Sequence, residues 1–148
     1  MFHRTVNLSK TNSFFLFDAR GTGKTSLLKE RFRDKDSIYI NLLSPSEFDR
    51  FFRNPDELSD ICKALAREKK WVIIDEIQKV PALLDVVHQM IENTSLKFVL
   101  TGSSSRKLKR GGKNLLAGRA FVLLMFFSGD RYLKFINRGF QLKIENYF

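Results

Sequence analysis

The chain has 148 residues, of which 43% are hydrophobic and 28% charged, a balance that predicts one soluble globular domain and excludes a disordered chain or a collagenous repeat. The single cysteine excludes an intramolecular disulfide and a cysteine-based zinc site, and no apolar run approaches the roughly 20 residues of a membrane-spanning helix, so we expect a cytoplasmic protein without membrane contact. The formal net charge is +10, with +8 of it in residues 101–148, which indicates a solvated basic face or an anionic partner.

Short apolar runs alternate with amphipathic stretches along the chain, which is typical of β-α-β units built around a parallel sheet. The runs predict strands over Ser13–Phe17, Ser37–Asn41, Trp71–Asp75, Lys97–Thr101 and Ala120–Met125. The stretches between them predict helices over Thr25–Phe32, Glu47–Phe52 and Pro55–Glu68, and a further helix that opens at Pro81. Because the run Trp71–Asp75 is almost wholly apolar, we expect a central strand that is buried on both faces.

The first predicted strand and helix are joined by a Gly-rich segment, DARGTGKT, residues 18–25. Small residues let such a turn point its backbone N–H groups inward, and the helix that follows presents its positive dipole end to the same phosphates. We expect Lys24 to reach the β- and γ-phosphates and the Thr25 hydroxyl to hold Mg²⁺. The residues expected to bind the nucleotide are Arg20, Gly21, Thr22, Gly23, Lys24, Thr25 and Ser26. An ordinary Gly-rich turn with an incidental lysine is the alternative interpretation.

Asp18 occupies the position at which the phosphate-loop pattern G-x-x-x-x-G-K-[ST] starts with glycine. Aspartate tolerates a left-handed backbone better than most residues, so the turn can survive the exchange. A carboxylate about 7 Å from a phosphate charge would cost on the order of 2 kcal/mol at an effective dielectric constant of about 20, which predicts weakened nucleotide affinity. Alternatively, Asp18 points into solvent or pairs with Arg20, and the affinity is then nearly normal.

Two adjacent carboxylates, Asp75 and Glu76, follow the apolar run of the third predicted strand. Ligands of open α/β sheets bind at this carboxyl end of the strands. We expect Asp75 to hold the water shell of Mg²⁺ together with Thr25, and Glu76 to polarise the attacking water in ATP hydrolysis. ATP is favoured over GTP because the chain has no Asn-Lys-x-Asp segment that would read guanine.

The fourth predicted strand ends in a hydroxyl-rich segment, TGSSS. Thr101, Ser103 or Ser104 can sense the γ-phosphate or orient the water, and we choose Ser103; a helix N-cap at Ser104 is an equally weighted alternative. Further along the chain, Arg119 is a candidate to stabilise the transition state, because an arginine near the γ-phosphate can do so from the same or a neighbouring subunit. We therefore expect catalytic roles for Glu76, Ser103 and Arg119.

The basic segment 106–119 carries six lysines and arginines and no acidic residue. Five of these residues surround a Gly-Gly turn that could follow a nucleic-acid backbone: Arg106, Lys107, Lys109, Arg110 and Lys113. An alternative function is therefore a basic nucleic-acid-binding module whose nucleotide site is a relic. A solvated basic face is the purely structural alternative.

A resemblance to a known family is carried by three segments: FFLFDARGTGKTSLLK, VIIDEIQKVPALLDVVHQMIE and KFVLTGSSSRKLKRGGKNLLAGRA. Over roughly residues 10–121 the chain resembles the prokaryotic AAA+-superfamily ATPases that usually carry a C-terminal domain of unknown function. The resemblance implies ATP and Mg²⁺ as ligands of a P-loop NTPase fold, with three α/β/α layers and a mostly parallel five-stranded sheet in the order 5-1-4-3-2. It implies Walker A roles for Lys24 and Thr25, Walker B roles for Asp75 and Glu76, a sensor role for Ser103 or Ser104, and an arginine finger at Arg119. A homo-oligomer, in which the arginine would act on a neighbouring subunit, stays open.

The sequence departs from that family at Asp18, where the family has glycine, and after Phe121. Beyond Phe121 the usual Phe-Pro-Leu-like segment and helical lid are replaced by VLLMFFSGDRYLKFINRGFQLKIENYF, in which no lid or further domain fits. We therefore expect a P-loop ATPase core over residues 1–125 and a divergent, mobile tail over residues 126–148, produced by a shortened reading frame. The expected function is Mg-dependent ATP binding with weak hydrolysis.

Overall fold

The structure, a computed structural model, describes residues 13–18, 28–29, 32, 36–65, 69–102, 121–128, 130–136 and 143–145. For residues 17 and 18 and for the ranges from 121 to 145, the description covers the backbone alone. None of the helices in these ranges combines the length and the apolar character that are needed to cross a lipid bilayer.

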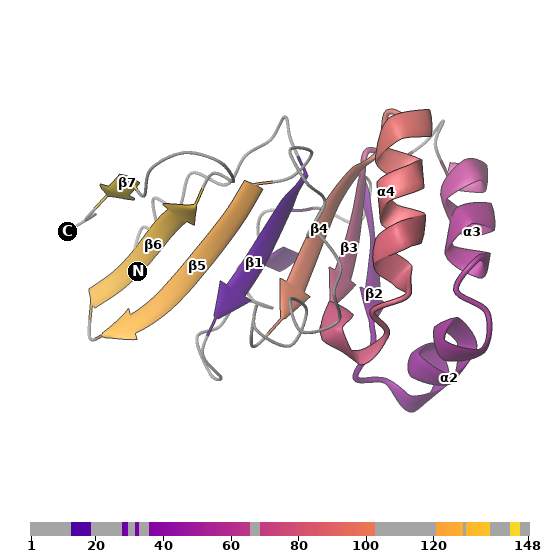
Figure 1. Ribbon diagram of the computed structural model, residues 1–148, viewed down its shortest axis with the longest axis horizontal. Helices are drawn as coiled ribbons and strands as arrows, with labels where there is room; N and C mark the ends of the chain where they lie inside the picture. Colours follow the sequence, from indigo (N-terminus) through magenta and orange to yellow (C-terminus); the bar gives the residue numbers. More distant parts are fainter. Residues whose placement is uncertain are drawn as a thin grey trace.

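One seven-stranded sheet runs through the molecule in the order β2-β3-β4-β1-β5-β6-β7 (Figure 1). Its strands are β1 (Phe14–Asp18), β2 (Ser37–Asn41), β3 (Trp71–Asp75), β4 (Lys97–Gly102), β5 (Phe121–Ser128), β6 (Asp130–Ile136) and β7 (Lys143–Glu145). All pairings among β1 to β5 are parallel, whereas β6 pairs antiparallel with both β5 and β7. The order of the first five strands confirms the 5-1-4-3-2 arrangement and the α/β fold class.

The expectation of five strands was too low, because β6 and β7 continue the sheet beyond β5. Ser128 and Asp130 are register partners, and β6 runs antiparallel alongside β5. The sequence of β6, DRYLKFI, has the aromatic and β-branched residues that favour strands, but its apolar residues do not alternate regularly enough to identify it as a strand beforehand. The expected domain boundary at residue 125 falls within β5, and the independence of the tail stays a prediction.

In the described part of the chain, three α-helices connect the strands on one side: α2 (Pro45–Arg53), α3 (Glu57–Leu65) and α4 (Leu83–Asn93), with a 3₁₀ turn, η1 (Ile77–Lys79), before α4. Residues 28 and 29 are also helical, within the helix predicted over Thr25–Phe32, but Phe32 itself is in a bend and the other residues of that range lie outside the described ones. Helix α2 is longer than expected because Pro45, whose missing N–H costs nothing there, occupies the start of its first turn.

Helices α3 and α4 both begin later than the sequence predicted. Helix α3 begins two residues after Pro55, at Glu57. Helix α4 begins at Leu83 and not at Pro81, because a preceding turn bonds the N–H of Leu83 to the Val80 carbonyl at 3.1 Å. The apolar face of α4 is buried as expected, because its leucines, valines and Met90 repeat at helical spacing.

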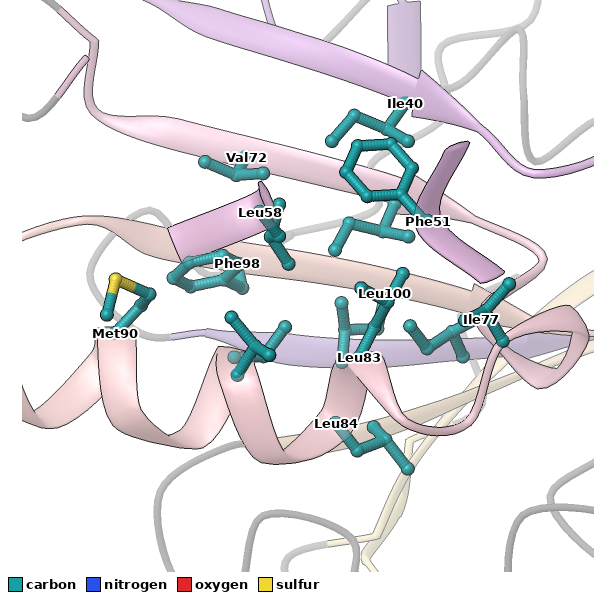
Figure 2. Packing of buried hydrophobic residues seen from close by; sticks show 14 of the residues in the cluster. Ile40, Phe51, Leu58, Val72, Ile77, Leu83, Leu84, Met90, Phe98 and Leu100 are labelled. Atoms are coloured by element: carbon teal, nitrogen blue, oxygen red, sulfur yellow. The ribbon is translucent and has the colours of Figure 1, made fainter. Parts of the chain in front are cut away.

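The core of the sheet lies in two layers, one on each face. Helices α2, α3 and α4 cover one face of the sheet (Figure 1), and Val72 and Ile74 of β3 belong to the large apolar cluster on that face. Figure 2 shows Met90 of α4 beside Phe98 of β4 in this layer. A second apolar cluster lies on the opposite face of the sheet: Phe14, Leu16, Leu28, Phe32, Trp71, Ile73 and Val99. Strand β3 is therefore buried on both faces, as predicted.

Parallel pairing brings the carboxyl ends of β1, β2, β3 and β4 to one edge of the sheet. Asn41 is the register partner of Asp75, and Phe17 is the partner of Gly102. The segment DARGTGKT starts with the last residue of β1, Asp18, at this same edge. The fold thus gathers the polar residues that follow these strands.

Candidate functional site

Asp75 is the last residue of β3 and the most buried carboxylate of the described residues, with 4% of its surface exposed. Strand alternation places its side chain on the same face as Trp71 and Ile73. Each carboxylate oxygen accepts a hydrogen bond from a neighbouring strand: Oδ1 from the Thr101 hydroxyl of β4, and Oδ2 from the Tyr39 hydroxyl of β2. These bonds compensate part of the cost of burying the carboxylate.

Thr101 connects the two adjacent carboxylate residues through one hydroxyl group. This residue is fully buried in β4, and its Oγ1 both donates to Asp75 and accepts the backbone N–H of Glu76 at 3.1 Å. A hydroxyl group can do this because it carries one donor and two acceptor lone pairs. The position of the Glu76 backbone is therefore coupled to the orientation of the Asp75 carboxylate.

Glu76 adopts a left-handed backbone conformation, with φ 62° and ψ 50°. In the part of the chain that the structure describes, no other residue except glycine has a positive φ. This conformation ends β3 and starts η1, in which the N–H of Lys79 bonds to the Glu76 carbonyl at 3.0 Å. The Glu76 carboxylate accepts a hydrogen bond from the Gln78 side-chain amide. The turn thus holds the Glu76 side chain against Gln78, directly after Asp75 in the chain.

Of the residues predicted from sequence, the described structure brings together Asp75, Glu76 and Thr101. Asp18 ends β1 at the same edge, and its backbone alone is described. The remaining predicted residues lie outside the described ranges: Arg20, Gly21, Thr22, Gly23, Lys24, Thr25, Ser26, Ser103, Ser104 and Arg119. The basic segment 106–119 lies outside them too, so nucleic-acid binding through it stays a prediction.

Tyr39 is the residue of this site that the sequence reasoning missed. Its hydroxyl contacts Asp75, although the two residues are 36 positions apart in the sequence. A signal was present: in the order 5-1-4-3-2, the strand that contains Tyr39 neighbours Trp71–Asp75, and tyrosine carries a polar tip on a long apolar body. No motif marks the residue, because its role arises from strand pairing.

Two other kinds of site find no support in the described residues. Cys62 is fully buried in α3, and desolvation raises the pKa of its thiol to about 12, so it stays protonated and is unsuited to act as a nucleophile. Within the described ranges, no three His, Cys, Asp or Glu side chains gather closely enough to hold a metal by themselves. The chemistry of this part of the chain therefore centres on Asp75 and its oxygen-bearing neighbours.

The comparisons with known proteins agree with this architecture. The family model described as an AAA domain matches residues 10–129. A solved structure that resembles the chain is that of PCH-2 from C. elegans, with 27% sequence identity and a TM-score of 0.50 over 82% of this chain. The match spans 36% of the PCH-2 chain. No curated protein sequence matches.

The family match covers far more than half of the chain, including all of the strands from β1 to β5. It therefore confirms the AAA+ resemblance that the three sequence segments indicated. The matching sheet order and the carboxylate at the end of β3 are consistent with it. The chain accordingly belongs to the AAA-domain family and is a nucleotide-binding, AAA-like P-loop domain.

Proposed function

We propose that this domain binds ATP together with Mg²⁺ and hydrolyses it weakly. The observation that supports this function best is the environment of Asp75, whose buried carboxylate accepts hydroxyl hydrogen bonds at both oxygens. It lies at the sheet edge where β1 leads into DARGTGKT. A carboxylate held in this way beside a phosphate loop is suited to a cation that accompanies a nucleotide.

The chemistry of the donor set fits Mg²⁺. This cation prefers oxygen ligands, and in nucleotide sites it takes one or two protein carboxylates and completes its shell with phosphates and water. Asp75 and the two hydroxyl groups bonded to it supply oxygen atoms, the kind of ligand that this cation prefers. Asp75 can therefore supply the one protein carboxylate that Mg²⁺ takes in such a site, and phosphates and water would complete the shell.

In this proposal, the loop from Arg20 to Ser26 wraps the phosphates, and Lys24 neutralises the β- and γ-phosphates. Thr25 and Asp75 hold Mg²⁺, which supplies positive charge to the phosphate oxygens. Glu76 orients and polarises the attacking water, whereas Ser103 and Arg119 are assigned to the γ-phosphate. Asp18 adds negative charge near the phosphates, which is the reason for proposing weakened affinity. The departures from the family pattern at Asp18 and after Phe121 are the reason for proposing weak turnover.

Calorimetric titration with Mg·ATP tests this function directly. We expect the wild-type chain to bind and Lys24→Ala to lose binding, because the variant lacks the cation that balances the phosphate charge. Lys63→Ala is the matched control, since Lys63 is an exposed lysine on α3, and it should bind as the wild type does. Circular dichroism melts would show whether all three chains are folded. Equal affinity in wild type and Lys24→Ala would remove the phosphate-loop assignment.

A further inference from the structure

Three neighbouring strands contribute one hydrogen-bonded row of polar side chains at the sheet edge: Tyr39 from β2, Asp75 from β3 and Thr101 from β4. The two hydroxyl groups donate to different oxygens of the same carboxylate, so Asp75 is held from both sides. Because β2 pairs with β3 along its whole length and β4 pairs with β3 up to the residue before Thr101, both donors are anchored to the strand that carries their acceptor. This geometry restricts rotation of the Asp75 carboxylate.

Tyr39 reaches this row because of its length. Its register partner on β3 is Ile73, two residues before Asp75, so a side chain at this position must extend along the neighbouring strand to reach the carboxylate. The long phenol ring bridges that offset, which a serine or threonine hydroxyl at the same position would not. The Tyr39 ring is held in turn by the apolar cluster around Trp71 and by the Lys29 ammonium, 5.8 Å from the ring centroid.

Mg²⁺ tolerates little deviation from octahedral geometry, and residues that hydrogen-bond a ligating side chain orient that ligand. We infer that Tyr39 is a positioning residue for Asp75 and thereby sets how strongly Mg²⁺ enhances nucleotide binding. This inference rests on the proposed function, because it requires Asp75 to act toward Mg²⁺. It adds a strand β2 residue to a site otherwise assigned to the loop after β1 and to the ends of β3 and β4.

The test compares ATP affinity in excess Mg²⁺ with ATP affinity in EDTA, and the ratio of the two dissociation constants gives the enhancement by Mg²⁺. Tyr39→Phe keeps the ring and its apolar contacts and removes the hydroxyl alone. We expect the affinity in EDTA to be unchanged and the enhancement to fall about tenfold. Thr94→Val is the matched control, because the Thr94 hydroxyl bonds Met90 and Leu96 at the end of α4, and it should keep the full enhancement.

A double-mutant cycle with Asp75→Asn separates positioning from general damage to the fold. If Tyr39 acts through Asp75, Tyr39→Phe should not reduce the enhancement further in the Asp75→Asn background. An equal further loss in that background would overturn the inference. If the wild type gains affinity from Mg²⁺ and Tyr39→Phe keeps all of the gain, the inference alone fails. If the wild type gains none, the proposed function fails and the inference fails with it.

A second measurement keeps the hydroxyl in place and does not depend on the folding of Tyr39→Phe. The chain has three tyrosines, so a 3-fluorotyrosine-labelled protein gives few fluorine resonances, which Tyr132→Phe and Tyr147→Phe would assign by elimination. We expect Mg·ATP to shift the Tyr39 resonance relative to ATP in EDTA, because the cation would draw charge from the carboxylate that accepts the Tyr39 hydrogen bond. An unchanged Tyr39 resonance with bound Mg·ATP would overturn the inference.

Discussion

Glu76 stores backbone strain next to the carboxylate that the proposed function uses. A left-handed conformation costs a residue with a Cβ atom about 1 to 2 kcal/mol relative to the right-handed regions. Three contacts hold Glu76 in it: its N–H bonds to Thr101, its carbonyl to the Lys79 N–H, and its carboxylate to Gln78. The strained turn thus ends β3 directly after Asp75 and directs the chain into η1.

The strain predicts an ordering of two variants at this position. Glu76→Gly should be more stable than Glu76→Ala by about 1 kcal/mol, because glycine adopts a positive φ without a steric penalty. Both variants lose the carboxylate and its bond to Gln78, so the difference between their unfolding free energies reports on the backbone conformation at residue 76. Urea denaturation monitored by circular dichroism gives the two unfolding free energies. An alanine variant as stable as the glycine variant would mean that residue 76 is not left-handed in solution.

At the scale of secondary-structure elements, β3 shows what the sequence predicts well. The sequence predicted a strand over Trp71–Asp75 from an unbroken apolar run that ends in a carboxylate. The structure has the same bounds, and all five residues are buried. The carboxylate at its carboxyl end follows from the same pattern. The left-handed Glu76 was not predictable, because the Thr101 contact that helps to hold it comes from a strand that is remote in the sequence. The contact between Tyr39 and Asp75 could be anticipated only from the predicted strand order, because no motif marks Tyr39.

Helix α3 carries a titratable group whose burial links stability to pH. Burial raises the pKa of the Cys62 thiol from 9.0 to about 12, so the unfolded chain releases this proton before the folded chain does. The unfolded state binds fewer protons between these two values, and the unfolding free energy therefore falls as the pH rises above 9. Well below pH 9 both states keep the proton, so the contribution of the Cys62 thiol to the unfolding free energy does not change with pH.

We expect this thiol to lower the unfolding free energy by about 1.4 kcal/mol between pH 8 and pH 10. Urea denaturation of the wild type and of Cys62→Ala at both pH values isolates the effect, because all other titrating groups are shared. The alanine variant is less stable at pH 8, since it leaves a cavity in the core, but it should lose less stability on going to pH 10. Parallel losses in the two proteins would show that the thiol is not desolvated.

At the scale of the whole molecule, the sheet has two differently built parts. The parallel part is covered by helices, with α2 packed on β2 and α4 on β4 (Figure 1). The second part, β5 to β7, extends the sheet from β1 through one parallel pairing and two antiparallel pairings, and no described helix covers it. The sequence predicted the parallel part because its apolar runs are continuous. It did not predict β6, whose aromatic residues lack a regular period, or β7, which has only three residues.

Hydrogen exchange should distinguish these two parts. The amides of β3 are paired with strands on both sides and buried under apolar layers on both faces, so we expect them to exchange most slowly. The amides of β6 should exchange faster, because on one side β6 pairs only with β7, the outermost strand of the sheet, which has three residues. Mass spectrometry of peptides that cover β3, β5 and β6 would give the order of protection, with β5 between the other two. If β6 were protected as strongly as β3, residues 126–148 would unfold together with the parallel part, and the core would extend well past residue 125.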